Sequence, residues 1–236
     1  MSSPRIEVYD DQASLARGVA GALVSRIGAA QAGGGSPSVA LTGGGVADAV
    51  HRELARLVDQ DVDWSRVDFW WGDERFVSRD SADRNALAAR AAFLDPAGVD
   101  PAHVHEIGSS DEFATATEAA SAYGRALSAH DGGSFEVVML GVGPDGHVAS
   151  LFPGHPALDA SDVAVAVTDS PKPPPERVSL TLPTLNRSRV TWLVVSGSAK
   201  ADAVAQALAG ADLPAAKVHG TEETVWFLDR EAASSL

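Results

Sequence analysis

The chain has 236 residues, of which 45% are hydrophobic, and this composition is that of a globular protein with one large domain or two small ones. It contains no cysteine, which excludes a disulfide scaffold, a thiol nucleophile and a metal site built on cysteine. The formal net charge is −14 at pH 7, with only 18 basic residues, so we expect no nucleic-acid-binding surface.

Met1–Tyr9 lacks the basic region and apolar run of a signal peptide. No later stretch approaches the roughly 20 apolar residues that span a bilayer. We therefore expect a cytoplasmic protein without a membrane partner.

Apolar runs typical of strands alternate with segments of helical periodicity along the chain. The first strand, Ile6–Tyr9, precedes a long helix for which Asp10 and Asp11 offer N-caps and in which apolar residues recur at steps of four. Further strands are predicted at Ser38–Thr42, Val67–Trp71, Phe135–Leu140, Val163–Val167, Val190–Val195 and Thr224–Leu228. Further helices are predicted at Val46–Val58, Ala82–Phe93, Ala114–Ala129 and Lys200–Leu208. Connections of helical length favour parallel pairing, so the sequence predicts a three-layer α/β/α fold with a mostly parallel sheet, in a single domain over residues 1–236.

In such folds ligands bind beyond the carboxyl ends of the strands. Gly43, Gly44 and Gly45 follow one strand and open a helix. Glycines let the backbone approach a ligand closely, and free amides at a helix start suit a phosphate. The alternative is a plain tight turn.

The segment Gly72-Asp73-Glu74-Arg75 follows the next strand. Burying two acidic side chains and an arginine costs free energy, so their presence at a strand end suggests a functional role. Arg75 offers a bidentate contact to a phosphate or a carboxylate. The alternative is a solvated corner held by ion pairs.

The segment 141–146 matches the pattern G-x-G-x-x-G after a strand. A dinucleotide site is disfavoured, because Pro153 interrupts the helix that should follow and because Asp145 and His147 place titratable groups in the loop. We predict a sharp loop that presents both side chains to a cleft, with His147 suited to proton transfer near neutrality. A structural histidine at a strand end is the alternative.

Lys200 follows the strand Val190–Val195 in the first turn of a helix, where a cation is disfavoured by the helix dipole. This placement suggests that Lys200 and the start of the helix together hold an anion. The alternative is that the lysine simply reaches solvent. Arg177, just past the proline-rich segment 170–175, is a second candidate cation. The remaining histidines show no metal-binding spacing, and they are His51, His103, His105, His130, His155 and His219.

Four segments together resemble the 6-phosphogluconolactonase family, which is related to the glucosamine-6-phosphate deaminases. They are Gly72–Arg75 with Arg84-Asn85 downstream, Leu140–Gly154, Lys172–Asn186 and Val195–Val204. The resemblance runs from the first glycine loop to the closing segment 225–229, which is most of the chain.

The resemblance implies hydrolysis of 6-phospho-D-glucono-1,5-lactone without a metal or organic cofactor, on a fold like that of the deaminases and ribose-5-phosphate isomerase. By motif position, His147 matches the general base and Asp145 its neighbour. Arg75, Arg177 and Lys200 match groups that face the substrate, the last two near its phosphate. Asp73 matches the proton-transfer aspartate of the deaminases and is expected beside the substrate.

Two positions depart from the family pattern. The first loop, usually S-G-G-S-T-P, reads T-G-G-G-V-A over 42–47 and so misses a hydroxyl phosphate donor of that pattern, and Arg84 replaces a serine. A deaminase or isomerase is the first alternative, but that branch keeps a glutamate five residues after the loop histidine, where this chain has Phe152. The second alternative is a non-catalytic sugar-phosphate-binding protein.

Overall fold

A six-stranded parallel sheet forms the centre of the molecule. The computed structural model describes residues 3–58, 62–130 and 134–236. The strand order is β1-β9-β8-β5-β2-β3, and every neighbouring pair is parallel. The strands are β1 (Arg5–Tyr9), β2 (Ser38–Leu41), β3 (Asp68–Trp71), β5 (Val137–Leu140), β8 (Val190–Val195) and β9 (Glu223–Asp229).

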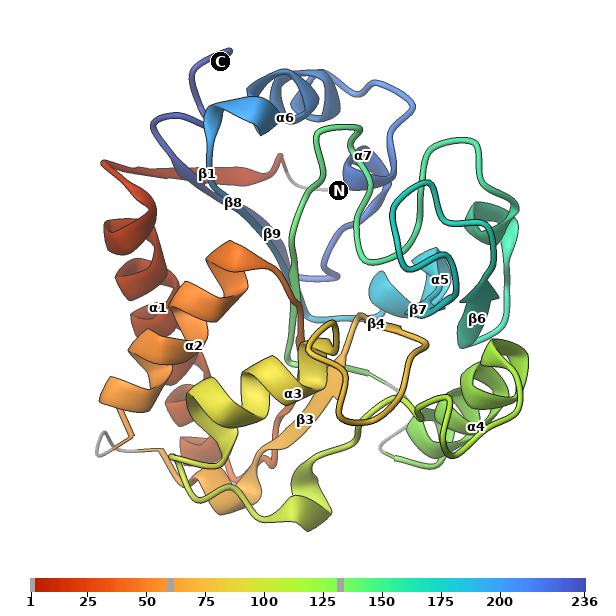
Figure 1. The fold of residues 1–236 in the computed structure, drawn as a ribbon. Coiled ribbons are helices and arrows are strands. Elements are labelled where there is room, and N and C mark those ends of the chain that lie inside the picture. Colours follow the sequence, from red (N-terminus) through yellow and green to blue (C-terminus); the bar gives the residue numbers. More distant parts are fainter. Residues whose placement is uncertain (1–2, 59–61, 131–133) are drawn as a thin grey trace.

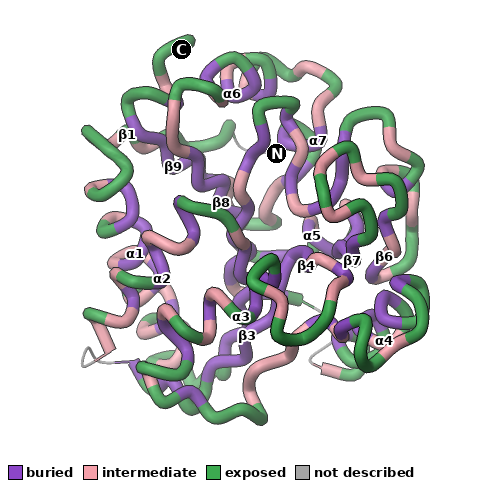
Figure 2. Tube along the Cα trace, in the orientation of Figure 1, coloured by how far each residue is buried: buried purple, intermediate pink, exposed green. Residues whose placement is uncertain are grey.

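Helices flank this sheet, as the sequence predicts. In Figure 1, α1 and α2 lie on one side of the sheet, whereas α6 and α7 lie on the other. Figure 2 shows buried residues along the central strands and on the inner sides of α1 and α2. The helices are α1 (Gln12–Ala32), α2 (Gly45–Arg56), α3 (Asn85–Ala89), α4 (Ala116–Ala129), α5 (Leu182–Leu185), α6 (Ala201–Leu208) and α7 (Pro214–Lys217). Within the described ranges, none of the helices combines the length and apolarity needed to cross a bilayer.

The first helix forms as its sequence pattern indicates. The Asp11 carboxylate accepts a hydrogen bond from the Ser14 amide at 2.7 Å, which caps the helix start. The predicted apolar positions are all fully buried, and they are Leu15, Val19, Leu23 and Ile27. Side chains four residues apart share one face of a helix, so this stripe packs onto the sheet.

A second, antiparallel sheet corrects one part of the prediction. It consists of β4 (Asp73–Arg75), β7 (Arg177–Leu180) and β6 (Ala164–Val167), in that order, and α4 packs against β6 and β7. The strand predicted at 163–167 therefore lies outside the parallel sheet. The 73–75 segment is not a loop, because after Gly72 the chain pairs with β7, a strand that the flanking prolines concealed.

The helix predicted at Ala82–Phe93 begins later and changes its winding. It starts at Asn85 because the Glu74 carboxylate accepts hydrogen bonds from the amides of Asn85 and Ala86, each at 2.8 Å. After α3, a wider π-helical turn covers Arg90–Leu94. Glu74 thereby fixes the start of α3 to the end of β4.

Candidate active site

A pocket of about 250 Å³ lies where several strands of the central sheet end. Thr42 follows β2 and Gly141 follows β5, and both line it. Eight of the site residues that the sequence predicts also line it, and they are Gly43, Gly44, Gly45, Asp73, Arg75, His147, Arg177 and Lys200. The ninth, Asp145, contacts His147 from the same loop.

The glycine loop opens α2 toward this pocket. Gly44 is the N-cap of α2 with φ of +96°, a conformation that favours glycine, and no side chain caps the helix there. A Cβ at Gly43 would collide with the Asn85 amide group, so the backbone and this side chain approach closely. The first amides of a 12-residue helix thus lie at the pocket wall, where helix starts favour anions.

His147 and Asp145 form a close pair at the pocket edge. The Nδ1 atom of His147 lies 2.5 Å from Oδ1 of Asp145. The ring also packs against Phe152, with 4.6 Å between the ring centroids. A Cβ at Gly143 would collide with the imidazole, so this position must stay small. The imidazole is therefore held from three sides while it lines the pocket.

Lys172 joins this pair, and the sequence prediction missed it. Its Nζ lies 3.4 Å from Oδ1 of Asp145 and 3.3 Å from Nδ1 of His147. It also lines the pocket. The available signal was its place at the start of the segment 172–186, in a chain with only three lysines.

Burial controls the protonation of His147. It lowers the pKa of the imidazole below its ordinary value, although the hydrogen bond and charge of Asp145 act in the opposite direction. Lys172 lowers this pKa further. For Asp145, burial opposes ionisation, but His147 and Lys172 outweigh it and the pKa of Asp145 lies below its usual range. Near neutral pH the pair is thus a neutral imidazole beside a carboxylate.

Asp73 is buried at the pocket wall. Its Oδ2 accepts a hydrogen bond from the Ser150 hydroxyl at 2.6 Å, and its backbone carbonyl accepts one from the Asn85 amide group at 3.0 Å. Its negative charge raises the pKa of His147. Asp73 therefore holds Ser150, which follows His147 in the chain, and Asn85, which contacts the glycine loop.

Arg75 and Arg177 stand directly opposite each other in the small sheet. They are partners in the β4–β7 register, and both line the pocket. Like charges directly opposite destabilise an antiparallel pair. Burial lowers the pKa of Arg177 below its ordinary value, and the charge of Arg75 adds to this effect. An anion in the pocket would relieve the repulsion.

The donors of Arg177 are largely engaged by the chain itself. Its guanidinium donates to the carbonyls of Lys172, Pro173 and Pro174, at 3.1, 3.1 and 3.2 Å. Arg177 therefore braces the proline-rich segment while it lines the pocket. This bracing was not visible from the sequence, because it depends on how the segment folds back over β7.

Lys200 ends a 3-10 turn, Ser198–Lys200, that leads directly into α6, and it is the N-cap residue of α6. It is half-buried, and burial lowers its pKa below the ordinary value while the charge of Asp229 opposes this shift. Asp229 in turn accepts hydrogen bonds from the Ser196 hydroxyl and the Gly197 amide. Lys200 thus lines the pocket at the start of a helix, with the negative charge of Asp229 acting on it.

Arg84 is neither a pocket cation nor a solvent-exposed side chain, the two possibilities left open by the sequence. It is buried and lies 3.6 Å from Glu74 and 3.5 Å from Glu106. It also donates to the Ile107 carbonyl at 2.8 Å. Burial raises the pKa of Glu74, and the charge of Arg84 opposes that rise. Arg84 thus forms a buried ion pair with Glu74, the residue that holds the start of α3.

Known proteins of one family match the chain along nearly its whole length. The family described as glucosamine-6-phosphate isomerases/6-phosphogluconolactonase matches residues 10–226. The 6-phosphogluconolactonase of Mycobacterium tuberculosis is 44% identical over 245 residues, which cover 99% of each chain. That of Streptomyces coelicolor is 43% identical over 248 residues, covering 99% of this chain and 95% of the relative.

Solved structures of the same family also resemble this chain. The 6-phosphogluconolactonase of Thermotoga maritima superposes with a TM-score of 0.86 at 29% identity, covering 96% of this chain and 99% of the other. That of Trypanosoma brucei gives 0.86 at 30% identity, covering 99% and 98%. A monomeric glucosamine-6-phosphate deaminase, at 21% identity and a TM-score of 0.83, shares the fold. This chain therefore belongs to the glucosamine-6-phosphate isomerase/6-phosphogluconolactonase family.

Proposed function

We propose that this chain hydrolyses 6-phospho-D-glucono-1,5-lactone to 6-phospho-D-gluconate, with His147 as the general base. The observation that carries the assignment of the base is the 2.5 Å contact between His147 and Asp145 at the edge of a pocket lined by cations. The relatives that share 43–44% of their sequence with this chain are named for the same reaction.

The hydrolysis follows from the orientation of His147. Asp145 accepts a hydrogen bond from the Nδ1–H group of His147, which leaves the Nε2 lone pair to take a proton from water. The water oxygen attacks C1 of the lactone, and negative charge develops on the carbonyl oxygen beside Arg75. The imidazolium then returns the proton to the ring oxygen as the C1–O bond breaks. General-base catalysis of this kind contributes roughly 10²–10⁴-fold.

The phosphate is bound at the other side of the pocket. The amides of Gly43, Gly44 and Gly45 at the start of α2 offer donors, and Lys200 and Arg177 offer charge. Because one hydroxyl donor of the family pattern is missing from the first loop, amides and cations carry more of this task. Phosphate binding also offsets the repulsion between Arg75 and Arg177.

A deaminase or isomerase reaction is disfavoured by the surroundings of His147. The deaminase branch needs a glutamate at the position of Phe152, and here the phenyl ring is buried against the imidazole. Asp73 occupies the place of the deaminase proton-transfer residue, so the distinction depends on the missing glutamate and on the segment 150–154. The location in the cytoplasm and the absence of a nucleic-acid partner stay predictions.

One assay separates the candidates. Proton release is followed from freshly generated 6-phosphogluconolactone, with subtraction of spontaneous hydrolysis, and ammonia release from glucosamine-6-phosphate serves as control. We expect enzyme-dependent proton release with the lactone and no ammonia. Ammonia release would identify the deaminase branch, and phosphate-sensitive binding of the lactone without turnover would identify a sensor.

A further inference from the structure

A second carboxylate–imidazole cluster lies at the start of β3, away from the pocket that the strand ends form. Asp68 is the first residue of β3, and its carboxylate is surrounded by His103, His105 and His130. The proposed hydrolysis uses none of these four residues. We propose that this cluster, called here the β3 histidine cluster, binds a Zn²⁺ ion.

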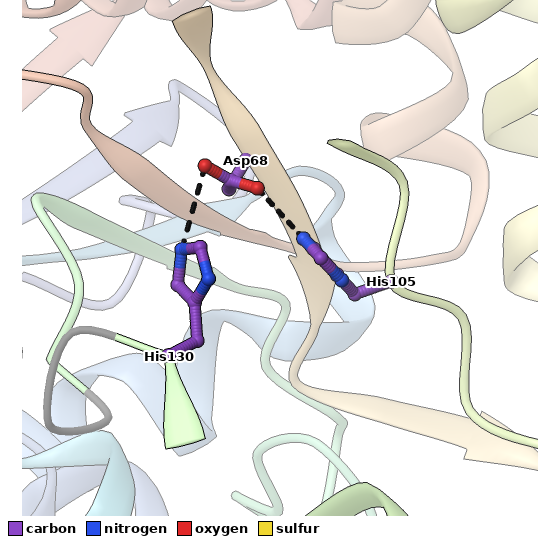
Figure 3. Close-up of side chains that lie close together, drawn as sticks. All are labelled: Asp68, His105 and His130. Atoms are coloured by element: carbon purple, nitrogen blue, oxygen red, sulfur yellow. Dashed lines mark hydrogen bonds and ion pairs between the residues drawn. The ribbon is translucent and has the colours of Figure 1, made fainter. Parts of the chain in front are cut away.

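The donor atoms converge on one point. Figure 3 shows the carboxylate of Asp68 between the rings of His105 and His130, with a ring nitrogen of each directed at a different carboxylate oxygen. His105 Nε2 lies 2.7 Å from Oδ1, and His130 Nε2 lies 3.4 Å from Oδ2. One ligand atom from each of the three residues lies within 4.8 Å of the other two. Such a set closes around a single ion when each atom moves to about 2 Å from it.

A fourth donor lies within reach. The Nδ1 atom of His103 is 3.1 Å from Oδ1 of Asp68. His103 and His105 are two residues apart, and the bridge between Val104 and Phe69 sets this stretch beside β3. His103 ends a short 3-10 helix, Pro101–His103, and His105 follows the extended residue Val104, which brings both rings to the same carboxylate. His103 lies outside the set of three whose ligand atoms are within 4.8 Å of one another, and its ring must move toward them to complete the four ligands that zinc takes in a tetrahedral site.

The surroundings hold the rings for this task. The imidazole of His105 stacks on Trp70, with 4.0 Å between the ring centroids and 14° between the planes. His130 packs against the same indole at 5.4 Å. Within the described part of the chain, His130 Nε2 is buried and makes no hydrogen bond. A nitrogen in that state gains a partner when it coordinates a metal.

Asp68 is held in place as a ligand by its neighbours. Its Oδ1 lies within hydrogen-bond distance of both His105 Nε2 and His103 Nδ1. The side chain of Asp68 is only 8% exposed, whereas those of His105 and His130 are 26% and 29% exposed. The partly open imidazoles leave a path by which an ion enters.

The sequence concealed this cluster because its members are far apart. His103 and His105 lie 35 and 37 residues after Asp68, and His130 follows at the end of α4. A bound ion would tie together β3, the 103–105 segment and the last turn of α4. The predicted role is therefore a structural cross-link, independent of the hydrolysis.

The test is a titration of the metal-stripped full chain with Zn²⁺ by calorimetry, together with thermal unfolding. We expect one equivalent bound at the β3 histidine cluster and a higher unfolding temperature with zinc. His130→Gln and His105→Gln should each weaken this binding by about 100-fold or more, since even residues that only orient zinc ligands contribute about 10–100-fold. Circular dichroism establishes that each variant is folded.

Two further variants locate the ion. His219→Gln, which removes an imidazole elsewhere, should bind Zn²⁺ as the unaltered chain does. His147→Gln should also keep the binding, because it alters the pocket and not the cluster. A visible absorption spectrum of tetrahedral Co²⁺ in the unaltered chain, lost in His130→Gln, would give independent support. The proposal is overturned if the unaltered chain binds no zinc, if folded His130→Gln and His105→Gln bind it equally well, or if His147→Gln abolishes the binding.

Discussion

The molecule contains two clusters in which aspartate meets histidine, and their surroundings give them different chemistry. At the pocket, one imidazole shares one carboxylate with a lysine, and the side chain of Asp145 is 37% exposed. At the start of β3, three imidazoles share the carboxylate of Asp68, which is 8% exposed. The arrangement at the pocket leaves one ring nitrogen of His147 available to accept a proton. The β3 histidine cluster instead directs several ring nitrogens at one carboxylate. The residue types alone therefore do not define a site.

The largest expected effect contrasts one histidine from each cluster. His147→Gln should lower kcat by roughly 10²–10⁴-fold with little change in KM, because the base is lost while the phosphate contacts stay. His105→Gln is the matched control and should turn over the lactone at the normal rate. Steady-state kinetics on fresh lactone measure both. Near-normal turnover by His147→Gln would refute the assignment of the base.

The next effect concerns the cations that line the pocket beside His147. Lys200→Met should raise KM about 10- to 100-fold, because charge-assisted contacts to a phosphate contribute roughly 1.5–3 kcal/mol. Lys217→Met is the control, since Lys217 pairs with Asp212 at 2.7 Å outside the pocket. Inhibition by inorganic phosphate should weaken in parallel. Unchanged phosphate inhibition would show that the anion lies elsewhere.

Stability separates the two aspartates. In metal-free protein, Asp68→Asn should lower the free energy of unfolding by about 1–3 kcal/mol at pH 7, because the partly buried imidazoles around it lose a charged partner. Asp145→Asn should change it by only about 0.5 kcal/mol, as for other exposed positions. Since the pKa of Asp68 is lowered in the folded state, its contribution is present above the unfolded value and disappears as the pH falls through the folded value. Urea unfolding at two pH values measures this, and equal losses for both variants would contradict the contrast.

The smallest effect is a pair of opposite pH shifts at the pocket. Asp145 raises the pKa of His147 and Lys172 lowers it. The acid limb of kcat/KM should therefore move to lower pH in Asp145→Asn and to higher pH in Lys172→Met. Ionisation of the substrate phosphate is common to all variants and cancels in the comparison. Shifts in the same direction would show that these groups do not act through His147.

Much of the fold and of the pocket could be predicted from local sequence. The alternation of strands and helices fixed the parallel sheet, and residues just after strands were brought together because parallel strands end at one edge. The family, the fold and the reaction predicted from the four segments are confirmed by the comparisons. The roles of individual site residues and the single-domain organisation stay predictions.

What the sequence did not reveal depends on contacts between distant segments. The small sheet needs β4 to pair with β7 about 100 residues later, and no local pattern encodes that pairing. The burial of Arg84 depends on Glu74 and Glu106, and the position of Lys172 depends on the proline-rich segment that Arg177 braces. The β3 histidine cluster was missed for the same reason.

The facing arginines of the small sheet have a consequence for the order of the chain. The paired strands β4 and β7 are destabilised in part by the repulsion between the charges of Arg75 and Arg177. A bound anion would remove that repulsion. Binding of the ligand then stabilises the pairing of β4 with β7. Amide hydrogen exchange in β4 and β7 should therefore slow when phosphate is added, so that the rigidity of these strands reports how full the pocket is.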